Sequence, residues 1–373
     1  MLASSFHSKN NGLAERANVQ LDLFDHSVRE HSEVARLLCI RHAPKSRCMM
    51  KQTYAQVWPA YNKAQTNEKS RFLELLYHLC FEIEDLPRKP GAGRARLPLK
   101  DMIFCSVFKI FSTVSGRRFI SDLRDAQQRG FITKTPHFNS VFNYLELEEM
   151  TDIVKALIVK SSLPLRGVEW DFAVDSSGFS TGQFTRWLHA KYRSDPQFRD
   201  KAEWIKVHLM CGVMTNIVTS VEVTGRNAGD SPQFAPLVEQ TAKNFVMNEV
   251  SADKAYSSEK NLALTLVKGA QPYIAFRSNA TASNKRSGSV WKRMFHLYQY
   301  NQEEYMQHYH KRSNVETTFS MIKGKFGERL RSKTQTAQIN EVLCKVLCHN
   351  LCCVIQSIYE LGIEADFYEG HQL

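Results

Sequence analysis

The hydrophobic pattern of this 373-residue chain changes its period near residue 166. Before that point, apolar residues recur every three or four positions, which is the spacing of amphipathic helices. After it come three short runs with the period of strands, at 167–180, 204–213 and 217–225. In the second run Val207, Leu209 and Cys211 occupy alternate positions, and turn residues separate the runs. The pattern predicts an antiparallel meander of three strands.

Strands and helices then alternate along the chain. Residues 229–244 have the pattern of a helix that Asp230 or Ser231 caps, and capping is the preferred role for Asp230. Residues 246–276 read as a strand ending before Asp253, a helix and another strand. A meander followed by α/β units predicts an α/β core in the order of a ribonuclease H-like fold.

The whole chain divides into five predicted segments, and the regions outside the α/β core are mainly helical. These are a helical N-terminal region (1–86), a basic Pro/Gly linker (87–98), a second helical region (99–165), the α/β core (166–330) and a C-terminal packing helix (331–373). The second helical region contains two short helices near four arginines, with Thr135 predicted to cap the later helix and Pro136 at its first position. This pair fits either a helix-turn-helix that binds DNA or an ordinary helical hairpin.

The stretch 309–323 is predicted to form one helix with two distinct faces. Its polar landmarks are Tyr309, Arg312, Glu316 and Lys323. At about 100° per residue, these four positions fall within an arc of about 60°. A separate apolar stripe is formed by Val315, Phe319, Ile322 and Phe326. The polar face is either an exposed surface with an i,i+4 ion pair or a site where a carboxylate lies between two cations.

Two further acids stand at the predicted ends of strands. Asp175 closes the first strand, and Asp253 follows a later one. Together with Glu316 they match the carboxylate set that holds two Mg²⁺ ions roughly 3.5–4 Å apart beside a phosphodiester, with Mn²⁺ as the alternative metal. Each acid also has a purely structural interpretation. Asp175 could be an Asx-turn residue, Asp253 a helix cap and Glu316 a surface ion-pair partner. Asp171 shares a strand face with Asp175 and is interpreted as an edge residue.

Composition supports a polyanionic partner and a cytoplasmic protein. Lys and Arg total 49 against 38 Asp and Glu, a formal net charge of +11. We find no apolar run of the roughly 18 residues that a membrane span requires, and no signal-peptide pattern at the N-terminus. The nine cysteines include no CxxC pair, which favours reduced, buried thiols.

These motifs together resemble the DDE transposases of bacterial insertion sequences. The four landmarks fit the signature Tyr-x2-Arg-x3-Glu-x6-Lys of one branch without a gap. AVDSSGF resembles the first Asp motif of the family, and ADKAY resembles the second, Asp-x-x-Tyr, with Ala255 where Gly is common. The resemblance covers 166–356. Only 62 residues separate Asp253 from Glu316, which is too few for the large β insertion of some members.

The resemblance implies a ribonuclease H-like enzyme that uses divalent metal to cleave DNA at transposon ends and join the freed 3′-hydroxyl to target DNA. Asp175, Asp253 and Glu316 would be the metal ligands. DNA backbone contacts are assigned to Tyr309, Arg312 and Lys323 and, in a basic segment between strands, to Arg186, Lys191 and Arg193. Double-stranded DNA and a homodimer or larger synaptic complex are the expected partners, in the cytoplasm and on the nucleoid. The alternatives are a nuclease of the same fold without strand transfer, or an inactive DNA-binding derivative.

Overall fold

The computed structural model describes residues 57–87, 96–181, 204–282, 288–365 and 367. All of them lie within Gln56–Leu373, which packs as one unit. Most of the predicted N-terminal region, and residues 88–95 of the predicted linker, fall outside the described residues. The N-terminal helices described are α2 (Trp58–Cys80), α3 (Leu99–Ser112), α4 (Phe119–Gln128), α5 (Phe138–Leu145), α6 (Glu149–Ser162) and the 3₁₀ turn η1 (Leu163–Leu165).

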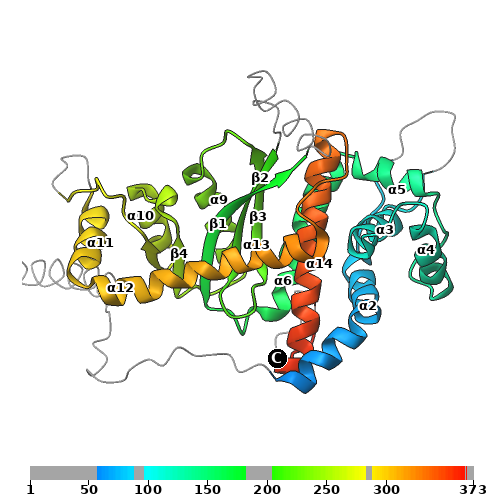
Figure 1. Cartoon of the computed structure of the whole chain (residues 1–373), viewed down its shortest axis with the longest axis horizontal. Coiled ribbons are helices and arrows are strands. Elements are labelled where there is room, and N and C mark those ends of the chain that lie inside the picture. Colours follow the sequence, from blue (N-terminus) through cyan, green and yellow to red (C-terminus); the bar gives the residue numbers. More distant parts are fainter. Residues whose placement is uncertain (1–56, 88–95, 182–203, 283–287, 366, 368–373) are drawn as a thin grey trace, which may run out of the picture. The chain divides into compact units, whose positions relative to one another are not determined.

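Five strands form one mixed sheet in the order β3-β2-β1-β4-β5 (Figure 1). The strands are β1 (Asp171–Ser180), β2 (Trp204–Gly212), β3 (Val218–Gly225), β4 (Glu249–Ala252) and β5 (Gln271–Ile274). β1, β2 and β3 pair antiparallel, whereas β4 pairs in parallel with β1 and β5 in parallel with β4. The predicted meander followed by α/β units is therefore confirmed as a mixed α/β sheet.

Helices cover both faces of this sheet. They are α9 (Ser231–Ala242), η2 (Lys254–Tyr256), α10 (Glu259–Val267), α11 (Ser289–Tyr300), α12 (Gln302–Tyr309), η3 (His310–Arg312), α13 (Ser313–Phe326) and α14 (Gln335–Leu361). Alternate residues of a strand point to opposite faces. Phe172 and Val174 of β1 pack in a cluster with α9, α10 and α11, whereas Ala173 and Phe179 pack with α13 and α14. Odd-numbered residues of β1 thus face α13.

The C-terminal packing helix is α14, which lies beside α2, α3 and α6 (Figure 1). Its apolar side chains belong to the same cluster as those of α2, α3 and α13. By length and composition α14 is apolar enough to cross a membrane, but 78% of its most apolar window is buried inside the protein. Burial of that kind is what a core helix shows. Seven cysteines among the described residues are free thiols, as predicted.

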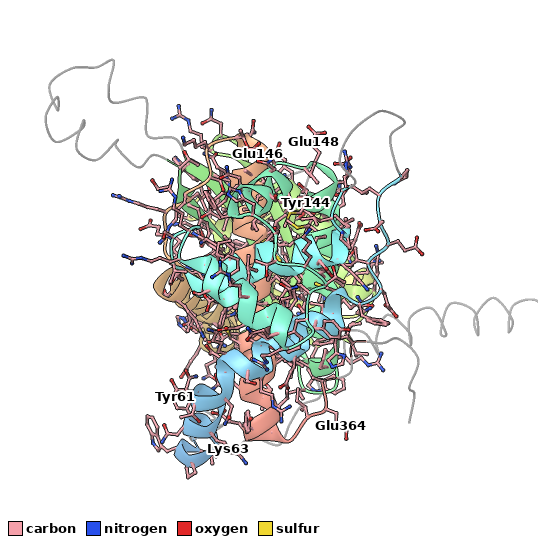
Figure 2. The ribbon with its side chains drawn as sticks, turned by 90° about the vertical axis from the view of Figure 1, so that its right-hand side faces the viewer. Tyr61, Lys63, Tyr144, Glu146, Glu148 and Glu364 are labelled. Carbon is pink, nitrogen blue, oxygen red and sulfur yellow. The ribbon has the colours of Figure 1, made fainter. Side chains whose placement is uncertain are left out.

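Helix α5 begins later than the sequence predicts. Its N-cap is His137, whose side chain accepts a hydrogen bond from the backbone N–H of Asn139. The hydroxyl of Thr135, the predicted cap, instead donates to Gln127 Oε1 at 2.6 Å. The capping prediction was wrong because a glutamine of α4 binds that threonine. At the other end of α5 stands Tyr144, which is labelled in Figure 2. Its hydroxyl donates to the Leu97 carbonyl at 3.0 Å and so ties α5 to the segment that leads into α3.

Candidate active site

The register of the parallel strands brings two acids to the same edge of the sheet. Val174 of β1 pairs with Ala252 of β4, and these are the last paired residues of the two strands. The next residue along each strand is an aspartate, Asp175 on β1 and Asp253 after β4. Asp253 follows its strand as predicted, but the prediction that Asp175 closes the first strand was wrong, because β1 continues to Ser180 by pairing with β2. Both side chains are half-buried. Two carboxylates therefore stand side by side where the parallel pairing ends.

Arg312 joins the first of these acids to the helical acid. Its Nη1 lies 2.7 Å from Asp175 Oδ2, and its Nη2 lies 2.7 Å from Glu316 Oε1. The Glu316 side chain is 56% exposed, whereas Asp175 and Arg312 are each 20% exposed. The i,i+4 ion pair that the sequence offered as the plain interpretation is present. It belongs to a three-residue bridge between α13 and β1.

Burial raises the pKa values of two groups in this site, the carboxyl of Asp175 and the phenol of Tyr309. Burial raises the pKa of the Asp175 carboxyl, with a small further contribution from the charge of Asp253. The Ser176 N–H, which donates to Asp175 at 2.8 Å, and the Arg312 guanidinium oppose that rise. Burial also raises the pKa of Tyr309, which interacts with Arg312. Tyr309 consequently keeps its proton and can donate a hydrogen bond.

Lys323 approaches the same strand three turns further along the helix. Its ammonium donates to Ser177 Oγ at 2.9 Å and lies 5.2 Å from the centre of the Phe179 ring. A more distant contact joins it to Glu328 at 3.9 Å. Because Asp175 and Ser177 lie on one face of β1, Arg312 and Lys323 line one surface, as the helical arc predicts.

The predicted apolar stripe holds this helix against the sheet. Its four residues are at most 7% exposed: Val315, Phe319, Ile322 and Phe326. The stretch differs from the prediction in one respect, since α12, the 3₁₀ turn η3 and α13 follow one another in place of a single helix. Lys311, within η3, binds Asp171 Oδ2 at 2.7 Å and Glu249 Oε2 at 2.8 Å.

Glu249, which binds Lys311, also contacts a histidine. His308 Nδ1 lies 2.8 Å from Glu249 Oε1, and its ring stacks on Tyr273. These contacts fix η3 to the beginnings of β1 and β4. Asp171 thus has the structural role at the strand edge that the sequence favoured. Lys311 and His308 were not predicted from the sequence, because their partners are distant in the chain. Asp171 lies 140 residues before Lys311, and Glu249 lies 59 residues before His308.

Asp175 and Glu316 are bound to a protein cation, and the described acids do not form a closed metal cage. Among the described residues, no three His, Cys, Asp or Glu side chains come together closely enough to hold a metal ion. Arg312 explains this, because its guanidinium lies between the carboxylates of Asp175 and Glu316. Mg²⁺ prefers oxygen ligands, keeps several waters and needs only one or two carboxylates. The donor chemistry where the β1–β4 pairing ends therefore fits Mg²⁺.

Asp230 has a different place from the one predicted. It occupies the N-cap position of α9, but its side chain makes no capping hydrogen bond. Its carboxylate accepts a hydrogen bond from Ser176 Oγ at 2.9 Å and forms an ion pair with Lys206. The capping interpretation was wrong because these two side chains compete for the carboxylate. Asp230 therefore contacts the residue next to Asp175, which no local sequence signal indicated.

Several predicted contacts lie elsewhere. Arg186, Lys191 and Arg193 are outside the described residues. Trp291 of α11 packs edge-on against Phe276. Its indole N–H donates to the Thr281 carbonyl at 3.1 Å. These contacts give Trp291 a structural role.

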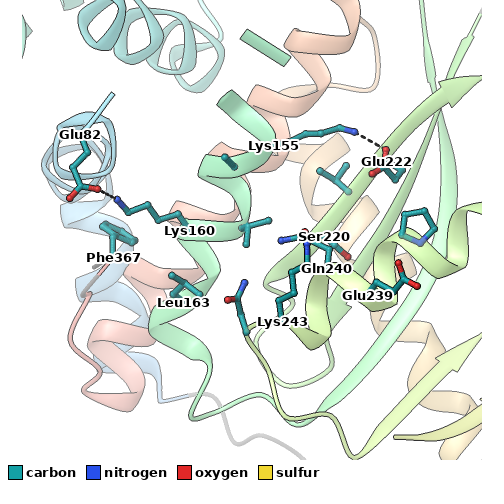
Figure 3. Close-up of a pocket in the computed structure, with 15 residues that line it drawn as sticks. Glu82, Lys155, Lys160, Leu163, Ser220, Glu222, Glu239, Gln240, Lys243 and Phe367 are labelled. Carbon is teal, nitrogen blue, oxygen red and sulfur yellow. Dashed lines mark hydrogen bonds and ion pairs between the residues drawn. The ribbon is translucent and has the colours of Figure 1, made fainter. Parts of the chain in front are cut away.

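A pocket lies between α6, β3 and α9 (Figure 3). Its lining includes none of Asp175, Asp253 and Glu316. Its charged lining residues are Glu82, Glu222, Glu239, Lys155, Lys160 and Lys243. Lys155 forms an ion pair with Glu222 at 2.7 Å. Equal numbers of acids and bases do not suit a polyanion, so this pocket does not extend the candidate site.

Comparison with known proteins points to one family. An alignment of 188 residues is 28% identical to the probable transposase for insertion sequence element ISA1214 of Archaeoglobus fulgidus, over 50% of this chain and 55% of that protein. The chain thus spans about half the length of this relative. A structure of the piggyBac transposase synaptic complex with hairpin DNA aligns over 83% of this chain and 77% of its own, at 12% identity and a TM-score of 0.36. Residues 166–351, which contain all three acids, match the family model of the transposase DDE domain. The chain therefore belongs to the DDE transposases of insertion sequences.

Proposed function

We propose that this protein cleaves DNA at the ends of an insertion sequence and joins the freed 3′-hydroxyl to target DNA. One observation carries the proposal: the strand register puts Asp175 and Asp253 side by side, and Arg312 connects Asp175 to Glu316. Family membership supports it. The strand order, three antiparallel strands followed by two parallel ones, supports a ribonuclease H-like core.

Asp175, Asp253 and Glu316 would hold the divalent metal, either Mg²⁺ or Mn²⁺. Two bound ions would supply activation of the attacking oxygen and stabilisation of the leaving one. The protein itself supplies position and charge. The sheet fixes Asp175 and Asp253, whereas Arg312 joins the exposed Glu316 to Asp175.

Arg312, Lys323 and Tyr309 would bind DNA phosphates next to the bond that breaks. A guanidinium binds phosphate oxygens in a two-pronged geometry, and an ammonium binds them as a point charge. Lys323 now donates to Ser177, a neutral hydroxyl that a phosphate oxygen readily replaces. Arg312 would exchange its carboxylate partners for a phosphate, which frees Asp175 and Glu316 to act together.

The remaining roles are assigned by the same proposal. The predicted segment 99–165 and the helical N-terminal region would recognise the transposon ends, and Arg186, Lys191 and Arg193 would contact the DNA backbone. Both ends must meet before they are joined, so a homodimer or larger synaptic complex is expected. The protein would act in the cytoplasm on double-stranded DNA.

A strand-transfer assay tests the proposal. Pre-cut element ends carrying a free 3′-hydroxyl are mixed with target DNA, Mg²⁺ and the full-length protein. The proposal predicts joined products that disappear with Asp253→Asn. Cleavage of uncut ends without joining would identify a nuclease instead. Specific DNA binding with neither product would identify an inactive DNA-binding derivative.

A further inference from the structure

The face of β1 opposite Arg312 carries a second polar arrangement. Successive residues of a strand point to opposite faces, so Ser176 faces α9 while Asp175 faces α13. Ser176 Oγ donates to Asp230 Oδ1 at 2.9 Å. Its backbone N–H donates to Asp175 at 2.8 Å. One residue therefore connects the first catalytic candidate to an acid on the other side of the sheet.

Two residues of the neighbouring strand β2 lie next to Asp230. Lys206 forms an ion pair with it, and His208 Nδ1 lies 3.5 Å from Asp230 Oδ1. His208 is fully buried, and its Nε2 lies 2.9 Å from Thr224 Oγ1. Burial lowers the pKa of His208 to about 4, so the ring is neutral near pH 7. The ion pair with Lys206 thus fixes the Asp230 carboxylate.

Tyr256 connects this arrangement to the second catalytic candidate. It closes the 3₁₀ turn that Asp253 begins, and its backbone N–H donates to the Asp253 carbonyl at 2.9 Å. Its ring is fully buried and packs against Phe234 of α9. Its hydroxyl is buried and has no hydrogen-bond partner among the described residues. A buried hydroxyl without a partner costs free energy, so an unpaired Tyr256 calls for a reason.

That reason is the position of the hydroxyl. Burial, and after it the charges of Asp175 and Asp230, raise the pKa of Tyr256, and an interaction with the Ser176 side chain opposes that rise. Tyr256 thus interacts with the same serine that donates to Asp230. Asp230, Ser176 and Tyr256 therefore form one group on the back of the sheet, behind the point where the β1–β4 pairing ends.

We propose that Asp230 is a positioning residue for the metal-binding carboxylates. Through Ser176 it fixes the backbone at Asp175, and with Tyr256 it fixes the turn that carries Asp253. Residues that orient metal ligands typically change metal affinity by about 10–100-fold when they are altered. The inference rests on the proposed metal-binding role of Asp175 and Asp253 and adds a residue that does not itself bind the metal.

Direct Mn²⁺ binding to the full-length protein, measured by electron paramagnetic resonance of free Mn²⁺, tests this inference without relying on activity. Asp230→Asn is expected to weaken Mn²⁺ binding about tenfold. Glu239→Gln, which removes the same charge from an exposed position of the same helix, is the matched control and is expected to bind Mn²⁺ like the parent. Parental affinity in Asp230→Asn would overturn the inference.

Asp175→Asn separates this inference from the proposed function. Loss of Mn²⁺ binding in Asp175→Asn with parental binding in Asp230→Asn rejects only the role of Asp230. Parental binding in both variants rejects the metal site itself. Tyr256→Phe removes only the hydroxyl of Tyr256, so it provides a second test of the positioning role if Asp230→Asn does not fold. Weaker Mn²⁺ binding with an unchanged melting temperature supports the positioning role, and unchanged binding in folded Tyr256→Phe contradicts it.

Discussion

Arg312 is the residue on which the candidate site depends. Its guanidinium contacts Asp175 and Glu316 at 2.7 Å each, so it neutralises two acids that would otherwise repel. The Arg312–Glu316 pair was predictable from i,i+4 spacing. The contact with Asp175 was not, because the two residues are 137 positions apart and helical periodicity does not say which strand a helix faces.

We expect Arg312→Ala to bind Mn²⁺ more tightly than the parent in the absence of DNA. Removing the guanidinium frees both carboxylates, and an ion pair of about 1 kcal/mol corresponds to a gain of about fivefold. The same variant should bind DNA more weakly. Calorimetry of the free protein measures the first effect, with Lys268→Ala on the exposed end of α10 as the control. Unchanged or weaker Mn²⁺ binding would count against competition between arginine and metal.

At the scale of elements, the sheet and the path from α12 to α13 place the site. Strand periodicity predicted the meander, and the apolar stripe of α13 predicted which side of the helix is buried. The 3₁₀ turn η3 was not predicted, because it depends on tertiary contacts. Lys311 forms ion pairs with Asp171 and Glu249, which lie on two separate strands. The role of Asp230 was missed for the same reason, because its serine partner belongs to a distant strand.

The orientation of α13 gives a prediction about DNA binding. Lys323 is 23% exposed and lies on the same surface as Arg312, which suits contact with one phosphate. Lys323→Ala should weaken binding to all DNA sequences and reduce the slope of log affinity against log salt by about 1. Titrations at several salt concentrations measure the slope, again with Lys268→Ala as the control. An unchanged slope would remove Lys323 from the DNA interface.

At the scale of the whole molecule, α14 joins the helical region to the sheet. Its apolar periodicity predicted a packing helix, but its polar contacts were not visible in the sequence. Asn350 Oδ1 accepts from the Val218 N–H of β3, and its amide donates to the Ile158 carbonyl of α6. The buried His349 donates from Nε2 to the Asn216 carbonyl at 2.9 Å. These groups are tolerated in the core because backbone atoms satisfy them.

His349 should make the stability of the fold depend on pH. Burial lowers its pKa to about 4, below the ordinary value of 6.5. The unfolded chain therefore binds the proton first, and the stability contributed by neutral His349 is complete above about pH 6.5 and is lost as the pH falls toward 4. At pH 5 this loss is about 2 kcal/mol relative to pH 7.

Melting curves at pH 7 and pH 5 measure the effect. His349→Gln should unfold at a lower temperature at pH 7 but lose less stability than the parent on acidification. His296→Gln, at an exposed position of α11, should keep the parental pH dependence. Equal pH dependence in the parent and His349→Gln would show that His349 is not the group that titrates.

The central claim is that Glu316 joins Asp175 and Asp253 in one catalytic site, and Mg²⁺-dependent cleavage by Glu316→Gln tests it most directly. The substitution keeps the size of the side chain and removes its charge. Glu303→Gln, on the exposed surface of α12, is the matched control. We predict that Glu316→Gln cleaves element ends at least about 100-fold more slowly than the parent, about 2.7 kcal/mol in the barrier, while Glu303→Gln cleaves at the parental rate. Cleavage by Glu316→Gln at the parental rate would contradict the claim.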